Sequence, residues 1–133
     1  MSMVGQSDQQ STAEAFDPTA MLDRIGGDLR LFAELVKMFL EDFPPLIDQI
    51  RQAINANDAP GFKQAVHTLR GAIGNFTVGG PYELAKRLEP MAQIDNLRDA
   101  QMLFDSLSAG VDQLAHALKL SVISSDSSQN EGR

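Results

Sequence analysis

The chain has 133 residues, enough for one domain with a substantial core, and 43% of them are hydrophobic. It has no cysteine, which excludes a disulfide framework and a thiolate metal site, and its net charge of -7 argues against nucleic acid as a partner. No apolar run approaches the roughly 18 residues of a membrane span, and the N-terminus shows no signal peptide, so we expect no membrane partner and a cytoplasmic location.

Both ends of the chain are polar and lack hydrophobic periodicity. Residues 1–16 are rich in Ser and Gln, and 121–133 includes a run of Ser, Asp, Gln and Asn. Segments of this composition have too little apolar surface to order themselves by burial. We therefore predict disordered tails over 1–16 and 121–133, on either side of one helical domain over 17–120.

A short helix is predicted to lead into this domain. Asp17 can serve as its N-cap, Pro18 takes the first helical position, and Gly26-Gly27 ends it. Asp28 then caps a long helix that reaches Asn55. Its apolar residues keep one phase throughout, namely Phe32, Leu35, Val36, Phe39, Phe43, Ile47, Ile50 and Ile54.

Two prolines interrupt the long helix without breaking its apolar phase. Proline inside a helix removes a hydrogen bond and clashes with the preceding turn. Because the hydrophobic pattern continues across Pro44-Pro45, two forms are consistent with it. One is a single kinked helix, and the other is a pair of nearly collinear helices with Asp42 as the cap of the second.

Three more helices are predicted after this one, over about 60–76, 81–91 and 96–120, and they are separated by turns rich in Gly, Pro, Asn and Asp. The last has apolar residues at alternating steps of three and four, at Phe104, Leu107, Val111, Leu114 and Leu118. No segment alternates with the period of a strand. The predicted fold is all-α: an antiparallel up-and-down four-helix bundle with a short N-terminal lead-in helix.

The helix predicted over 60–76 has one apolar stripe and a second side that bears a histidine. The stripe consists of Phe62, Ala65, Val66, Leu69, Ile73 and Phe76. His67 lies off the stripe, with Arg70 one turn later and Gly71 at i+4. A missing side chain at Gly71 leaves the imidazole open to a bulky group, and Arg70 can meet an anion placed on the ring. This combination indicates a histidine that accepts a phosphoryl group.

A purely structural interpretation of the same helix is also open. Glycine in a helix costs roughly 1 kcal/mol relative to alanine, and Gly71 and Gly74 could allow close packing or end the helix. His67 would then be an ordinary surface histidine. The segment 63–87 holds four cations against one carboxylate, a local charge of +3 in an acidic chain. This is consistent with ordinary scatter of surface charge, and also with a weak positive field near His67 that suits a phosphoryl group or an acidic partner.

The run His67-Thr68-Leu69-Arg70-Gly71 is followed by Asn75 and later by Leu88-Glu89. This pattern resembles that of histidine phosphotransfer (HPt) domains, which relay phosphoryl groups in multistep two-component signalling. Gly26-Gly27-Asp28 and the segment 39–44 also resemble the family's lead-in, so the likeness covers about 17–120. Thr77-Val78 departs from it, because many members carry Gly-Ala there.

The resemblance implies a phosphoacceptor role for His67, through Nε2. It implies a partner that is a response-regulator receiver domain or a hybrid sensor histidine kinase, with the acidic pocket and Mg²⁺ on the receiver. The chain itself then needs no cofactor and no metal. We expect Arg70 to hold the phosphoryl oxygens, and Gly71 to leave access to the ring. The flanking polar residues are expected to support the site, namely Gln64, Thr68 and Lys63.

Other chemistries have weak support in the sequence. His116 has no acidic residue or histidine at i±3 or i±4 and is interpreted as a surface histidine. No phosphate-binding loop is present, so we expect a phosphorelay intermediate that is no kinase by itself. We also expect it to be a monomer. Two alternatives stay open: the phosphoacceptor segment of a larger histidine kinase, and a non-catalytic helical interaction module.

Overall fold

The computed structural model describes residues 18–93 and 95–131, with side chains from 21 to 93 and from 95 to 123, and the described residues contain no strand. The all-α prediction is therefore confirmed. The elements are α2 (Pro18–Arg24), α3 (Leu29–Ala56), α4 (Ala59–Gly74), α5 (Pro81–Leu88), the 3-10 segments η1 (Glu89–Gln93) and η2 (Leu97–Ala100), and α6 (Gln101–Glu131).

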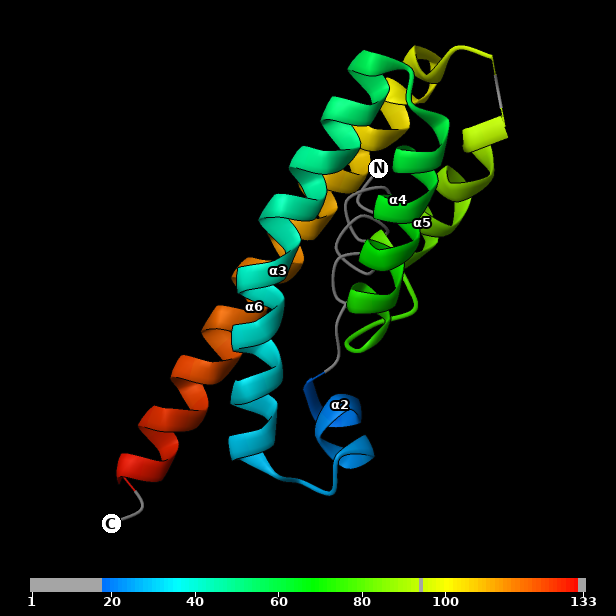
Figure 1. Cartoon of the computed structure of the whole chain (residues 1–133). Coiled ribbons are helices and arrows are strands. Elements are labelled where there is room, and N and C mark those ends of the chain that lie inside the picture. The colour runs from blue at the N-terminus through cyan, green and yellow to red at the C-terminus, as the bar shows by residue number, and fades with distance from the viewer. Residues whose placement is uncertain (1–17, 94, 132–133) are drawn as a thin grey trace, which may run out of the picture.

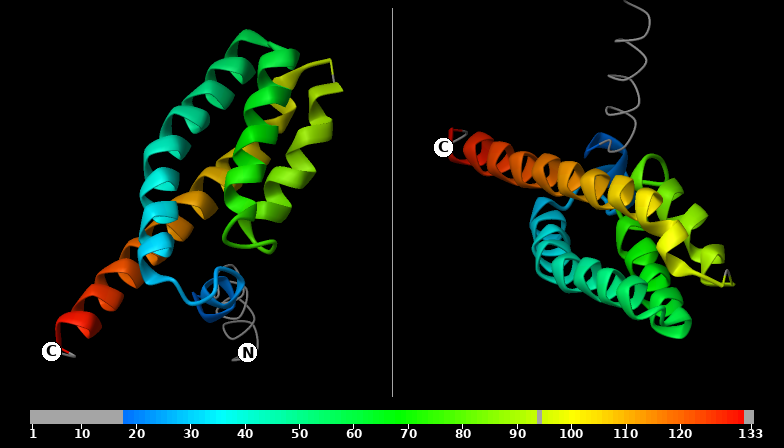
Figure 2. Two further views of the ribbon diagram at one scale, coloured as in Figure 1. Left: turned by 60° about the horizontal axis from the view of Figure 1, so that its bottom comes forward. Right: turned by 90° about the horizontal axis from the view of Figure 1, so that it is seen from above.

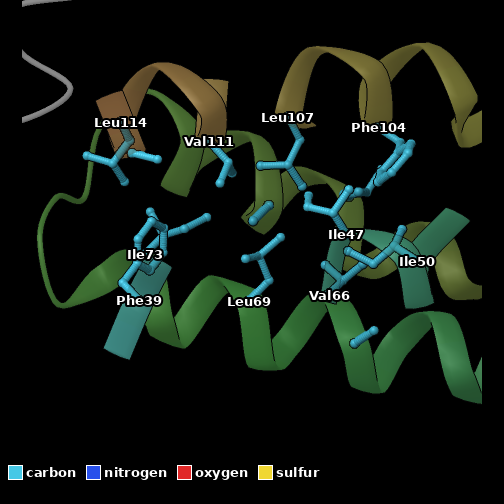
Figure 3. Close-up of a cluster of buried hydrophobic side chains, with 14 of the residues drawn as sticks. Phe39, Ile47, Ile50, Val66, Leu69, Ile73, Phe104, Leu107, Val111 and Leu114 are labelled. Carbon is cyan, nitrogen blue, oxygen red and sulfur yellow. The ribbon is translucent and has the colours of Figure 1, made fainter. Parts of the chain in front are cut away.

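The four longer helices form the predicted up-and-down bundle (Figure 1). Helix α3 packs against α4, α4 against α5 and α5 against α6. Helix α6 then packs along α3 and closes the bundle. The view from above in Figure 2 shows α3 and α4 side by side, with α6 running along the other side of the bundle. The core lies inside the bundle, and Figure 3 shows apolar side chains of α3, α4 and α6 that meet there.

The lead-in helix α2 begins at Pro18 as predicted, whereas its predicted cap, Asp17, lies outside the described residues. Met21 of α2 is buried in the core. The chain then turns through Gly26 and Gly27, which have φ of 73° and 76°, left-handed values that glycine adopts without steric cost. The predicted N-cap Asp28 is confirmed, since its Oδ1 accepts a hydrogen bond from the Leu31 N–H at 3.0 Å.

One continuous helix of 28 residues contains both prolines. Of the two forms consistent with the sequence, a pair of capped helices is therefore wrong, and Asp42 lies within the helix. The physical reason is burial: Phe39 before the prolines and Ile47 after them enter the same core. Their packing outweighs the hydrogen bonds that Pro44 and Pro45 remove.

The helix predicted over 81–91 ends earlier, because α5 stops at Leu88. The last helical N–H is that of Glu89, which donates to the carbonyl of Ala85, and Pro90 has no N–H with which to continue. The chain then tightens into η1. The final helix starts near its predicted place, with Asn96 capping η2 by accepting from the Arg98 N–H, and α6 follows from Gln101.

The predicted end of the last helix at Leu120 is wrong, because α6 continues to Glu131. No glycine or proline occurs between 121 and 131, so nothing in the sequence terminates the helix before Gly132. Val122 also packs against the core, which extends the apolar seam by a turn. Residues 1–16, predicted as a disordered tail, lie outside the described residues.

Candidate functional site

Helix α4 presents His67 on its outer side. Asp58 caps this helix by accepting a hydrogen bond from the Gly61 N–H at 3.0 Å, and the whole predicted stripe is buried. Burial of the stripe fixes the rotation of α4, so the opposite side is held towards solvent. The side chain of His67 is accordingly 65% exposed.

A carboxylate that the sequence analysis left without a role lies against this histidine. Glu89 Oε2 is 3.2 Å from His67 Nδ1, and Glu89 Oε1 accepts a hydrogen bond from Arg70 Nη1 at 3.0 Å. The Glu89 side chain is 18% exposed, which makes it the most buried of the three. Its position follows from the fully buried Leu88 and the end of α5, which turn Glu89 towards α4. In the sequence, the Leu88-Glu89 pair was the feature that could have identified Glu89 as a residue of the site.

The contact with Glu89 distinguishes the two ring nitrogens of His67. A carboxylate accepts hydrogen bonds, so it favours the tautomer that carries the proton on Nδ1. Nε2 then keeps its lone pair and is the nitrogen available to react. The same carboxylate stabilises positive charge that develops on the ring when Nε2 forms a bond.

Arg70 is held on both sides. Beyond its ion pair with Glu89, its guanidinium carbon lies 5.9 Å from the centroid of the Tyr82 ring, and its side chain is 31% exposed. The structure therefore gives Arg70 a contact that the sequence analysis did not foresee. It orients Glu89, and through that carboxylate it orients the ring of His67.

The two glycines of α4 have different surroundings. A Cβ added at Gly71 would meet nothing within 4 Å, so this glycine leaves open space beside His67. A Cβ at Gly74 would lie 3.1 Å from Cε1 of Tyr82, a tight contact between α4 and α5. The access interpretation fits Gly71, and the packing interpretation fits Gly74.

The remaining predicted site residues surround His67 without touching it in any hydrogen bond or ion pair of the described part of the chain. Gln64 and Thr68 face α3 and line a groove of ≈ 570 Å³ between the two helices. Lys63 is exposed one turn before His67. His116 is exposed on α6, as interpreted from the sequence.

Neither a metal cluster nor a membrane span is found in the described ranges. Within 18–93 and 95–131, no group of three or more His, Cys, Asp and Glu side chains could hold a metal ion. No helix of the same ranges is long and apolar enough to cross a bilayer.

Thr77, which departs from the family pattern, stabilises the turn after α4. Thr77 is buried, and its Oγ1 accepts a hydrogen bond from the Gly79 N–H at 3.0 Å. Arg24 of α2 donates to the backbone carbonyl of Asn75 at 3.0 Å, so the lead-in helix covers the end of α4. Two side chains thus fix the path of the chain from α4 towards α5.

The fold and the site together define a helical bundle that presents one exposed histidine against a carboxylate. The chain matches the Hpt domain family model over residues 34–119, and it therefore belongs to that family, the histidine phosphotransfer domains of phosphorelay signalling. Members of the family interact with response regulators and hybrid kinases.

Among solved structures, the chain is similar to the HPT domain from the Hpt sensor hybrid histidine kinase of Shewanella. The TM-score is 0.72 at 20% sequence identity, over 84% of this chain and 96% of that one, which is evidence on the fold alone. A search of curated proteins gave no match.

Proposed function

We propose that His67 is the phosphoacceptor of this Hpt domain and exchanges its phosphoryl group with the aspartate of a response-regulator receiver domain. The observation that carries the proposal is the pairing of His67 Nδ1 with Glu89 Oε2 at 3.2 Å in a side chain that is 65% exposed. This pairing orients the ring and leaves Nε2 free on the solvent side. His116 has no such partner among the described residues.

The transfer step forms one bond and breaks one. The lone pair of Nε2 attacks the phosphorus of the partner's aspartyl phosphate, and the P–O bond to the aspartate breaks with its electron pair leaving on the carboxylate. The proton stays on Nδ1, so the phosphorylated ring carries a positive charge that Glu89 Oε2 stabilises. Both the acyl phosphate and the phosphoramidate are reactive, so the exchange runs in either direction.

The chain contributes position rather than a metal or a proton relay. The buried stripe of α4 and the Arg70–Glu89 ion pair hold the imidazole in one orientation before the partner arrives. Gly71 leaves room for the receiver to close over the ring. Mg²⁺ and the acidic pocket belong to the receiver in this scheme, and the domain acts as a monomer in the cytoplasm without kinase activity of its own.

The receiver docks on the side of α4 that carries Gln64 and Thr68. Both side chains line the groove of ≈ 570 Å³ that α3 completes with apolar and amide side chains, including Leu46 and Gln49. A groove of this composition beside the reacting atom suits a partner surface of mixed apolar and polar character.

Incubation with a phosphorylated receiver domain tests the proposal. We expect acid-labile, alkali-stable label on the wild-type chain and none on His67→Gln, with the same helical circular dichroism. His116→Gln is the matched control and should label normally. Label that persists in His67→Gln would overturn the assignment, and a wild-type chain that binds the receiver without taking up label would favour the non-catalytic interaction module.

A further inference from the structure

The guanidinium of Arg70 is already committed to other contacts. It pairs with Glu89 at 3.0 Å and lies 5.9 Å from the Tyr82 ring centroid. Turning Arg70 towards a phosphoryl group on Nε2 would release the carboxylate that orients His67. A phosphoryl group on this ring therefore calls for a second cation, and the surroundings of His67 offer one from α5.

Two contacts fix which side of α5 faces α4. Tyr82 lies against Arg70 and Gly74, and Glu89 contacts Arg70 and His67. Lys86 is four residues after Tyr82 and three residues before Glu89, so it lies on the same side of α5 as both.

Its height along α4 follows from the direction in which helical side chains lean. Side chains of one helix all lean towards its N-terminus, so their tips keep the order of their Cα atoms. The ammonium of Lys86 therefore falls between the ring of Tyr82 and the carboxylate of Glu89. That is the level of Arg70 and Gly71, where the missing side chain leaves open space beside His67.

Lys86 is also exposed and unpaired. It makes no hydrogen bond or ion pair within the part of the chain that the structure describes. Ala85 and Leu88 are fully buried. The exposed Arg87 is five residues after Tyr82 and two before Glu89, so helical spacing places it on the other side of α5 from both. Lys86 is thus the cation of α5 that borders the space above Gly71.

We propose that the ammonium of Lys86 pairs with the phosphoryl oxygens carried by His67 Nε2. The proposal rests on the proposed function, because it requires His67 to be the phosphoacceptor. Lys63 is the less favourable candidate: it lies one turn before His67 on α4, whereas the open space at Gly71 lies one turn after it. The pairing makes no covalent bond and moves no proton, and it neutralises charge on the transferred group.

Phosphorus NMR on the phosphorylated chain tests this directly. A cation beside the phosphoryl group favours its more charged form, so Lys86→Gln should raise the pKa of that group by about half a unit. Lys86→Arg should restore the wild-type value. Arg87→Gln removes the same charge from the outer side of the same helix and should leave the value unchanged. The rate of phosphoryl transfer from the receiver to His67 should fall roughly threefold in Lys86→Gln and stay unchanged in the other two variants. Threefold is the factor that corresponds to half a pKa unit.

The outcomes separate the role of Lys86 from the proposed role of His67 as phosphoacceptor. A labelled wild-type chain whose phosphoryl pKa equals that of Lys86→Gln overturns the role of Lys86 and leaves His67 as the acceptor. Slower transfer in Lys86→Gln with an unchanged phosphoryl pKa assigns Lys86 to receiver docking, which also overturns the proposal. A wild-type chain that never takes up label on His67 overturns both.

Discussion

Glu89 connects His67 and Arg70 of α4 through its two carboxylate oxygens. Oε2 lies at His67 Nδ1 and Oε1 lies at Arg70 Nη1. Glu89→Gln keeps the shape but loses the charge that stabilises a phosphorylated ring. We expect transfer to slow about tenfold, the effect of losing a charge-assisted hydrogen bond of roughly 1.4 kcal/mol. Nitrogen NMR of the imidazole should also show a smaller share of the Nδ1–H tautomer.

A double-mutant cycle with Arg70→Ala decides whether Arg70 acts through Glu89. If it does, the two substitutions together should cost little more in transfer rate than either alone. Full additivity would instead mean that Arg70 contacts the phosphoryl group itself. Because the ion pair is partly exposed, we expect Arg70→Ala to change the free energy of unfolding by no more than about 1 kcal/mol.

Gly71 and Gly74 form a natural pair for testing access against packing. Gly71→Ala enters open space in a regular helix and should be neutral or stabilising by up to roughly 1 kcal/mol, with transfer retained. Gly71→Gln should fold normally but transfer poorly, because a long side chain at i+4 covers the ring. Gly74→Ala forces the Tyr82 ring to shift and should melt below Gly71→Ala. Thermal melts and transfer rates measure both, and an unfolded Gly71→Ala would contradict the access argument.

The helices were predictable wherever burial alone decides their phase. The periodic apolar residues of α3, α4 and α6 identify the core faces, and the structure buries the whole predicted stripe of α4. Helix ends were less predictable, because they depend on single residues. Pro90 shortens α5, and the absence of any breaker before Gly132 lengthens α6.

The partnership of Glu89 with α4 was beyond sequence reasoning for a different cause. It requires the relative height of two antiparallel helices, which is set by tertiary packing at Leu88 and Gly74. Local periodicity places His67 and Arg70 on one side of α4, since both belong to one helix. It has no information on which residue of the next helix lies opposite them.

Asn57 joins the end of α3 to the connection between η1 and η2. Its φ of 53° is left-handed, and its side chain donates to the Asp95 carbonyl at 3.1 Å and accepts from the Leu97 N–H at 2.9 Å. Asn57→Ala should destabilise the domain by about 2 kcal/mol. Roughly 1 kcal/mol comes from backbone strain at a left-handed residue, and the rest comes from the lost hydrogen bonds. Asn57→Gly keeps the backbone conformation and should cost about half as much. Urea unfolding distinguishes the two, and equal losses would show that the left-handed conformation adds nothing.

The chain as a whole is acidic, but the region around His67 is cationic. The net charge is -7, yet three cations of α4 and α5 lie near His67, namely Lys63, Arg70 and Lys86. An acidic molecule repels an acidic receiver, and a cationic region around His67, the proposed phosphoacceptor, would steer the approach to that face. Transfer below saturation should therefore slow as salt rises from about 0.01 to 0.15 M, where the screening length shortens from roughly 30 to 8 Å.

A pair of charge reversals assigns the salt effect to this face. Lys63→Glu lies beside His67 and should lower the association rate several-fold at low salt, with little change at high salt. Lys119→Glu makes the same charge change on α6, in the groove that faces α3, and should have a much smaller effect. Stopped-flow transfer at several receiver concentrations separates association from the chemical step. Equal losses in the two variants would mean that net charge, rather than the cationic region around His67, governs the encounter.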